Sequence, residues 1–409
     1  MTLMALLLWI TGCGTEQSQS SGLQVSSNVA YGEDDYKKII AANNHLGFQL
    51  LSKAEKDKNG NLFVSPMSLY MALSMVYNGA DGETKEEISQ VLQVHGMDAT
   101  ELNKANASLL SSFNHHSKSV ELNVANSIWL NNQFHFQKDF AQNNKDYFNA
   151  KIQAIDIADS VSSSMINDWV KKSTNDKIKD IVEEPLSRDL VAILINAIYF
   201  KGDWTYKFNK KQTEKRAFTL EDGTQKEKPL MMLDEKLSYF ENNEFQAISL
   251  PYGNEEMSMK IFLPKEGSSL EEFELSLTTE SWKEWNTQFY KRQGVIRLPK
   301  FQLQYEAILN DVLKNLGMPV AFTEDANFRK MIQEDETIMI SEVKQKTFLD
   351  VNEEGTEAAA ATSVSMETTA APTEAFYMEV NRPFFMAITD DVTGAILFLG
   401  EIANPIAGD

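Results

Sequence analysis

Side chains that commonly act as nucleophiles, metal ligands or acid–base catalysts are few in this chain. There is one cysteine, Cys13, so an internal disulfide and a paired-cysteine zinc site are both excluded. No two histidines have the spacing of a helical zinc motif; they are His45, His95, His115, His116 and His135. The sequence also lacks a phosphate-binding loop and a nucleophile-elbow motif. We therefore expect no enzyme activity, no bound metal and no cofactor.

The chemistry open to Cys13 is covalent lipidation. Leu3–Ile10 is an apolar run too short to span a bilayer, as in an export signal, although no Lys or Arg precedes it. Ile10-Thr11-Gly12-Cys13 resembles the bacterial lipobox, in which the cysteine becomes the lipidated first residue. We expect a signal segment at 1–13 and a polar tether at 14–33, giving an exported protein with a lipid anchor at the envelope or cell surface. The alternative is a plain secretory signal.

Composition narrows the class of partner. The 409 residues are 43% hydrophobic, enough for a large core, and the net charge is −21. An acidic chain of this kind is a poor ligand for nucleic acid or for an anionic membrane surface, so we expect neither. Membrane contact would come only through the lipid anchor.

Helical and strand-like segments then follow one another without regular alternation. Helical periodicity begins at Tyr36, and residues 61–92 read as a second helical region, with Ser65 as the helix cap before Pro66. Residues 165–182 form an amphipathic pattern. Strands are expected at Leu122–Leu130, at Leu190–Phe200 buried on both faces, and in a C-terminal hairpin that turns at Thr393-Gly394. The pattern indicates an α+β fold.

One segment, "EEGTEAAAATSVSMETTAAPTEAF" at 353–376, has the composition of a linker but not its pattern. Successive residues of a strand point to opposite faces. Counted by twos from Thr356, one face is uncharged, and the other carries Glu357 and Glu367. Within this segment no proline occurs before Pro372, and the residues that lead it are small enough to pass between packed strands. The segment is therefore predicted to be able to become a strand.

Seven motifs resemble the serpin family in order and spacing, over about Tyr36 to Pro405. They are "NLFVSPMSLYMALSM", "ANSIWL", "INDWVKKSTNDKIKDIV", "LINAIYFKGDW", "LPKFQL", "NEEGTEAAAAT" and "VNRPFFMAI". The resemblance implies one domain over 34–409, with three β-sheets, about nine helices and an exposed reactive-centre loop at about 353–379. It also implies a monomeric inhibitor of serine proteases, which forms a covalent complex with its target.

The resemblance assigns the loop residues. The hinge, which enters the main sheet first, comprises Glu353, Glu354, Gly355, Thr356, Glu357, Ala358, Ala359, Ala360, Ala361 and Thr362. The reactive bond is expected about fifteen residues beyond Gly355, at Thr369-Ala370, with Met366-Glu367 as an alternative. There is no Lys or Arg between Lys346 and Arg382, so trypsin-like proteases should not cut the loop. We expect elastase-like or subtilisin-like proteases as the targets, and papain-like cysteine proteases as a second class.

Two further groups follow from the same resemblance. The shutter beneath the main sheet would comprise Ser65, Pro66, Ser68, Asn196 and Gln345, and the breach, where the loop enters, would comprise Trp204, Lys300 and Glu353. Packing or capping roles remain open for each of these side chains. Gln345 stands where animal serpins often have histidine. Glutamine can donate and accept hydrogen bonds, so the network can survive, but a histidine-linked pH response is in doubt.

A non-inhibitory serpin that acts as a binding protein is the alternative function. Such members usually carry charged, bulky or proline residues in the hinge, and "GTEAAAAT" does not fit that pattern. The sequence therefore favours an inhibitor that acts as a suicide substrate.

Overall fold

The computed structural model describes residues 24–115, 119–356 and 375–408. Within those residues there are nine α-helices: α1 (Ile40–Leu51), α2 (Pro66–Tyr77), α3 (Gly82–Val91), α4 (Ala99–Ser112), α5 (Lys138–Phe148), α6 (Ser160–Ser173), α7 (Leu270–Ser276), α8 (Thr279–Gln288) and α9 (Asn310–Leu316). None of the helices in these ranges is long and apolar enough to cross a membrane.

Fifteen strands accompany the helices in the same ranges. They are β1 (Leu62–Val64), β2 (Val120–Asn131), β3 (Lys151–Ile155), β4 (Ala192–Asp203), β5 (Glu214–Thr219), β6 (Gln225–Glu241), β7 (Phe245–Tyr252), β8 (Met257–Pro264), β9 (Tyr290–Pro299), β10 (Phe301–Ile308), β11 (Glu342–Val351), β12 (Gly355–Thr356), β13 (Phe376–Glu379), β14 (Phe384–Asp390) and β15 (Ile396–Ile402). The predicted α+β class is confirmed.

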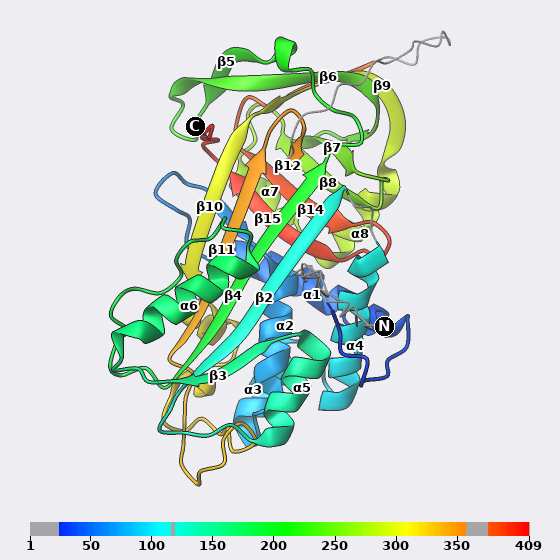
Figure 1. Ribbon diagram of the computed structural model, residues 1–409. Coiled ribbons are helices and arrows are strands. Elements are labelled where there is room, and N and C mark those ends of the chain that lie inside the picture. The colour runs from blue at the N-terminus through cyan, green and yellow to red at the C-terminus, as the bar shows by residue number, and fades with distance from the viewer. Residues whose placement is uncertain (1–23, 116–118, 357–374, 409) are drawn as a thin grey trace, which may run out of the picture.

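The strands form two hydrogen-bonded networks (Figure 1). One is a six-stranded sheet with the order β10-β11-β12-β4-β2-β3, and the other has nine strands in the order β1-β15-β14-β8-β7-β6-β9-β13, with β5 paired to β6. The three expected sheets form two hydrogen-bonded networks because one continuous strand, β6, joins two of them. It pairs with β9 along Leu230–Tyr239 and with β7 only along Ser238–Glu241.

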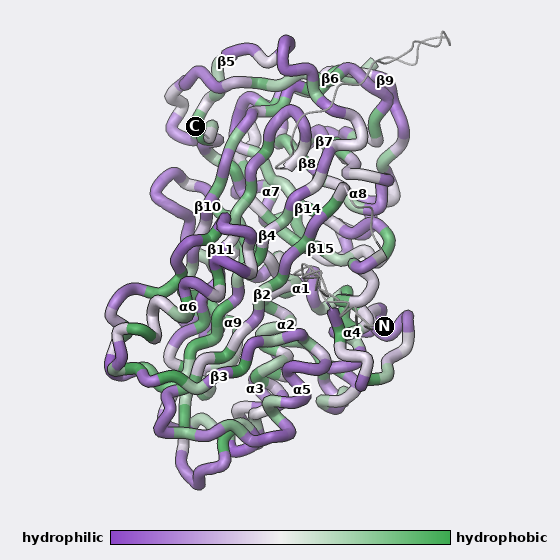
Figure 2. The backbone as a smooth tube through the Cα atoms, in the orientation of Figure 1, coloured by the Kyte–Doolittle hydropathy of each residue, from purple (hydrophilic) through white to green (hydrophobic). Residues whose placement is uncertain are grey.

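Helices cover the six-stranded sheet on both faces. Figure 1 shows α6 lying across one face, which we call the front, while α2 and β15 lie behind the sheet. Strand β4 is therefore covered on both sides, and its residues Ala192–Phe200 are all buried, as the lack of polar–apolar alternation predicts. Figure 2 shows apolar residues concentrated along the central strands and hydrophilic residues on the loops.

At the N-terminal end of α2, the local sequence pattern correctly predicts the start of the helix but not the strand that precedes it. Ser65 caps the helix by accepting from the Ser68 backbone N–H, and Pro66 is its first residue, as predicted. The helical interpretation of residues 61–92 is wrong at Leu62–Val64, which form β1 and pair with Leu399–Glu401 of β15. Three β-prone residues gain hydrogen bonds from a distant strand there, which local periodicity does not reveal.

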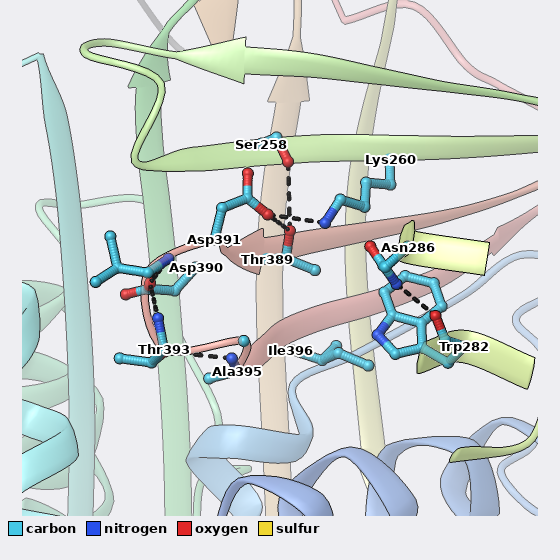
Figure 3. A network of polar contacts seen from close by, with 12 residues as sticks. Ser258, Lys260, Trp282, Asn286, Thr389, Asp390, Asp391, Thr393, Ala395 and Ile396 are labelled. Carbon is cyan, nitrogen blue, oxygen red and sulfur yellow. Dashed lines mark hydrogen bonds and ion pairs between the residues drawn. The ribbon is translucent and has the colours of Figure 1, made fainter. Parts of the chain in front are cut away.

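The C-terminal hairpin is confirmed, with its turn between β14 and β15. The Asp390 carboxylate accepts from the backbone N–H groups of Val392 and Thr393, both at 2.8 Å, and Gly394 has a φ of 78° (Figure 3). Beside the turn, Lys260 of β8 forms an ion pair with Asp391 at 2.8 Å. These contacts fix the turn that joins β14 to β15 and tie it to β8.

Candidate functional site: the seam between two central strands

The candidate site is the boundary between β4 and β11, which we call the seam. Along most of the seam these strands pair directly in parallel, from Glu342 opposite Ile193 to Phe348 opposite Tyr199. Beyond that point they part, and β12 lies between them. Thr356 is opposite Val351 of β11 on one side and Gly202 of β4 on the other. The predicted hinge thus begins inside the sheet as a short antiparallel strand.

Gly355 and Thr356 fit this narrow space for different reasons. A Cβ at Gly355 would collide with the backbone of Gly202 and would lie 2.7 Å from the Cα of Asp203, so glycine is required by close approach. The Thr356 hydroxyl lies 2.8 Å from the hydroxyl of Tyr252, and both residues are fully buried. The side chain of Thr356 therefore faces the back of the sheet.

The turn that joins β11 to β12 is bound to the chain that follows β4. Trp204 donates from its backbone to the Glu354 carbonyl at 3.0 Å and from its indole to the Asn352 carbonyl at 2.9 Å. Its ring stacks on Tyr252 with centroids 4.5 Å apart. The carboxylate of Glu354 pairs with Lys207 at 3.1 Å and with Lys210 at 2.9 Å. The structure therefore places Trp204 directly against the turn.

Glu353 and Lys300, predicted to lie together, form an ion pair at 3.2 Å. Glu353 also accepts from the hydroxyl of Thr213 at 2.8 Å. Burial alone would raise the pKa of Glu353, but the hydrogen bonds from Thr213 and Lys300 outweigh it and hold the pKa below its ordinary value. The carboxylate is thus kept charged at the entrance to the seam.

Below β12, the direct contact across the seam is a buried hydrogen-bond network. Gln345 of β11 donates to the Asn196 side-chain oxygen of β4 at 2.7 Å and to the Ser65 carbonyl at 2.9 Å. The side-chain carbonyl of Gln345 accepts from the Ser65 backbone N–H at 2.9 Å. The Asn196 side chain donates to the Ser68 hydroxyl. The prediction that glutamine acts as donor and acceptor here is confirmed. Pro66 is buried as the first residue of α2.

Sequence reasoning missed Asn126 of β2. Its side-chain oxygen accepts from Asn196 at 2.6 Å, so Gln345, Asn196 and Asn126 form one buried line across three adjacent strands. Asparagine is depleted in strands, and the available signal was that two asparagines, Asn123 and Asn126, occur inside the strand-like segment Leu122–Leu130. A buried amide in that position needs partners, which the neighbouring strand supplies.

Several predicted positions lie outside the described residues. These are Cys13 and, in the loop, Glu357, Ala358, Ala359, Ala360, Ala361, Thr362, Met366, Glu367, Thr369 and Ala370. Within the described part of the chain, no group of three or more His, Cys, Asp or Glu residues is arranged to hold a metal ion.

Known proteins resemble this chain in sequence over most of its length. The family profile described as Serpin (serine protease inhibitor) matches residues 41–405. Iripin-2 of Ixodes ricinus is 32% identical over 376 residues, covering 89% of this chain and 93% of the relative. A serpin-like protein of Methanosarcina mazei is 33% identical over 377 residues, covering 90% and 87%.

Solved structures agree with the sequence matches. The native state of tengpin, a thermophilic serpin, superimposes with a TM-score of 0.84 at 32% identity, over 92% of this chain and 96% of tengpin. Human thyroxine-binding globulin gives 0.82 at 25% identity, over 91% of this chain and all of the globulin. A thermophilic serpin and a thyroxine-binding globulin thus share this fold. The family match and the shared fold show that this chain belongs to the serpin family.

Proposed function

We propose that the protein inhibits proteases as a suicide substrate, by cleavage of its loop and insertion of the loop into the six-stranded sheet. The observation that carries this proposal is β12. The hinge already pairs with both β4 and β11, in the antiparallel direction that a longer insert needs. Cleavage near Thr369-Ala370 would free the chain beyond Thr356 to extend this strand while the target remains attached as an acyl-enzyme. The catalytic serine belongs to the target.

The register of β12 predicts where the inserted residues would lie. Counting six residues on from Thr356, and six back from Val351 and Gly202, places Thr362 between Gln345 and Asn196. These two side chains now bond directly to each other. The Thr362 hydroxyl can accept from one amide and donate to the other, so an inserted loop would replace the hydrogen bond that it breaks.

The same register assigns the two faces of the insert. Residues that share a face with Thr356 would point to the back of the sheet, where Tyr252 already meets Thr356. That face is uncharged, as a buried surface requires. Glu357 and Glu367 would point to the front. The alternation in the sequence and the orientation of Thr356 in the structure therefore support the same arrangement.

The energy scale of insertion is large. Beyond Thr356, which is already paired, thirteen residues, Glu357–Thr369, would each gain about one backbone hydrogen bond worth roughly 1 kcal/mol net, which amounts to about 10–20 kcal/mol. That is comparable with the stability of a whole domain. The intact protein would therefore be metastable.

Mixing the mature protein with elastase, subtilisin and trypsin, followed by denaturing gels, tests the proposal. We expect a covalent complex with elastase or subtilisin and none with trypsin, because the loop lacks Lys and Arg. A Thr356→Arg variant should be cleaved without complex, with the ratio of complex to cleaved product at least about tenfold lower. Arginine there would overpack a fully buried position. Thr356→Ser is the matched control and should inhibit normally.

Clean cleavage of the unmodified protein across a broad protease panel, with no complex, would contradict the proposal. That result would favour a non-inhibitory binding protein, the second candidate. This candidate is supported by the structural similarity to thyroxine-binding globulin. Normal inhibition by Thr356→Arg would refute the insertion register.

Export and lipidation at Cys13 form a separate part of the proposal, with 1–13 as signal, 14–33 as tether and 34–409 as the inhibitory domain. Its support is the sequence pattern around the only cysteine. Expression in bacteria with labelled palmitate tests it, with Cys13→Ala as the control. Equal labelling of both proteins would exclude the anchor.

A further inference from the structure

A fully buried carboxyl group lies behind the six-stranded sheet, on the C-terminal strand β15. Glu401 is opposite Leu62 of β1 and Phe385 of β14, so its neighbours on the adjacent strands are apolar. Its side chain is 0% exposed. Burying an ionised carboxylate costs far more than burying a neutral group, so a charge at Glu401 would need full compensation.

Two ionisable side chains reach Glu401 from other elements. Helix α7 packs on β14, with the rings of Phe273 and Phe385 5.4 Å apart, and the next residue of the helix is Glu274. The loop between α1 and β1 supplies Lys56. Its ammonium lies 2.8 Å from Oε2 of Glu401 and 3.7 Å from Oε1 of Glu274. One ammonium group thus faces two carboxyl groups.

The hydrogen bonds of these carboxyl groups are incomplete. Both oxygens of Glu401 and Oε1 of Glu274 are buried, and no donor in the described part of the chain makes a well-aligned hydrogen bond to them. Buried acceptors normally have a partner, and a proton on one of the two carboxyl groups would supply the missing donor. The two groups would then hydrogen-bond to each other, and Lys56 would neutralise the one that stays ionised.

The surrounding titratable groups do not offset a second negative charge. They are acidic or stay neutral: Glu221 in the turn between β5 and β6, Glu55 and Asp57 on either side of Lys56, and Tyr305 of β10. Tyr305 donates to the Glu55 carbonyl at 2.7 Å, and burial raises the pKa of Tyr305 to about 12. Loss of the shared proton would therefore leave a net negative charge between α7 and β15.

We propose that Glu274 and Glu401 share one proton at neutral pH, and that loss of this proton at alkaline pH loosens the contact between α7 and β15. The packing behind the six-stranded sheet is thereby sensitive to pH. This sensitivity does not depend on the loop or on the proposed inhibitory function.

The pKa of Glu401 sets the direction of the effect. Burial first, and then hydrogen bonding to Glu274, raise the pKa of Glu401 from its ordinary value of 4.5 to about 8, although Lys56 lowers it in part. Between these two values the folded protein keeps a proton that the unfolded chain releases. The stabilisation that the proton provides is complete below pH 4.5 and is lost as the pH rises through about 8.

Hydrogen exchange of backbone amides, measured by mass spectrometry on the full chain between pH 6 and pH 9, tests the proposal. Glu401→Gln keeps the shape of the protonated side chain and cannot ionise. Dividing the exchange rate of the unmodified protein by that of the variant at the same pH cancels the intrinsic effect of pH. For peptides of α7 and β15 this ratio should rise at least about tenfold across the range. For peptides of α6, on the front of the six-stranded sheet, it should stay near one.

Glu271→Gln is the matched control, because Glu271 is an exposed carboxylate on the same helix as Glu274. It should behave as the unmodified protein does. Glu274→Gln is a second variant, which decides the question if Glu401→Gln does not fold. It leaves Glu401 paired with Lys56 alone, so Glu401 should ionise at lower pH and the rise between pH 6 and pH 9 should disappear.

Infrared spectroscopy at pH 7 provides a direct view of the proton. The absorption of protonated carboxyl groups should be weaker in Glu401→Gln than in the unmodified protein and should be unchanged in Glu271→Gln. Equal absorption in all three proteins would overturn the proposal. The same dependence of exchange on pH in the unmodified protein, Glu401→Gln and Glu274→Gln would overturn it as well.

Discussion

The top and the middle of the seam differ in how they are held. At the top, β4 and β11 are already apart, and β12 fills the space through backbone pairing and the contact between Thr356 and Tyr252. In the middle the strands touch, and fully buried amides join Gln345 to Asn196. The top is therefore prepared for entry of the loop, whereas the middle must be broken before the loop can advance.

The top and the middle of the seam also differ in the chemical groups that hold them. Charged side chains hold the turn at the top, where Lys207, Lys210 and Lys300 are reached by solvent. Such pairs contribute little individually and exchange readily with water. The middle uses neutral amides and hydroxyls without solvent access, for which a lost partner costs far more. The barrier to insertion should thus lie in the middle of the seam.

Asn196→Ala should show the largest effect. It removes the partner of Gln345, Ser68 and Asn126 in a place that water does not reach. We expect the intact protein to lose about 2–4 kcal/mol of stability, measured by urea unfolding, and to take up a synthetic peptide with the sequence of Thr356–Thr369 faster.

Asn131→Ala is the matched control for that change. It lies at the partly exposed end of β2 and should cost less than about 1 kcal/mol. Comparable losses for the two variants would remove the distinction between the middle of the seam and its surroundings.

Glu353→Gln at the top should have a smaller, pH-dependent effect. Because the pKa of folded Glu353 lies below its ordinary value of 4.5, its charge stabilises the folded protein above that value. The stabilisation is lost as the pH falls through the lower, folded pKa. The unmodified protein should be more stable than the variant by up to about 1 kcal/mol at pH 7, and the two should converge as the pH falls below 4.5 and through the folded pKa.

Urea midpoints measured between pH 7 and pH 3.5 test this expectation. A difference that stays constant over the whole range would show that the charge of Glu353 is not the source of its contribution.

The sequence was most informative where one strand or one helix end decided the outcome. The cap at Ser65, the burial of β4 and the hairpin at Gly394 follow from local pattern. Motif resemblance brought Gln345, Asn196 and Ser65 into one group, but not their geometry. Ser65 and Gln345 are 280 residues apart in the chain, and nothing local indicates that their backbone and side-chain groups bond to each other.

Other features could not be predicted because their partners are set by packing of distant elements. The lysines that hold Glu354 come from the chain after β4, and Asp180 meets Lys346 only because Asn167 fixes the segment beyond α6. Local residue pattern predicts which side chains need partners. The tertiary arrangement decides which partners they find.

The central claim is that β12 is the start of a longer inserted strand, and the melting temperature before and after loop cleavage tests it most directly. A gain of about 10–20 kcal/mol predicts that cleavage near Thr369-Ala370 raises the melting temperature by more than about 20 °C. Limited proteolysis with an elastase-like enzyme followed by calorimetry would supply both values. An unchanged melting temperature in a chain shown by mass spectrometry to be cut in the loop would contradict the account.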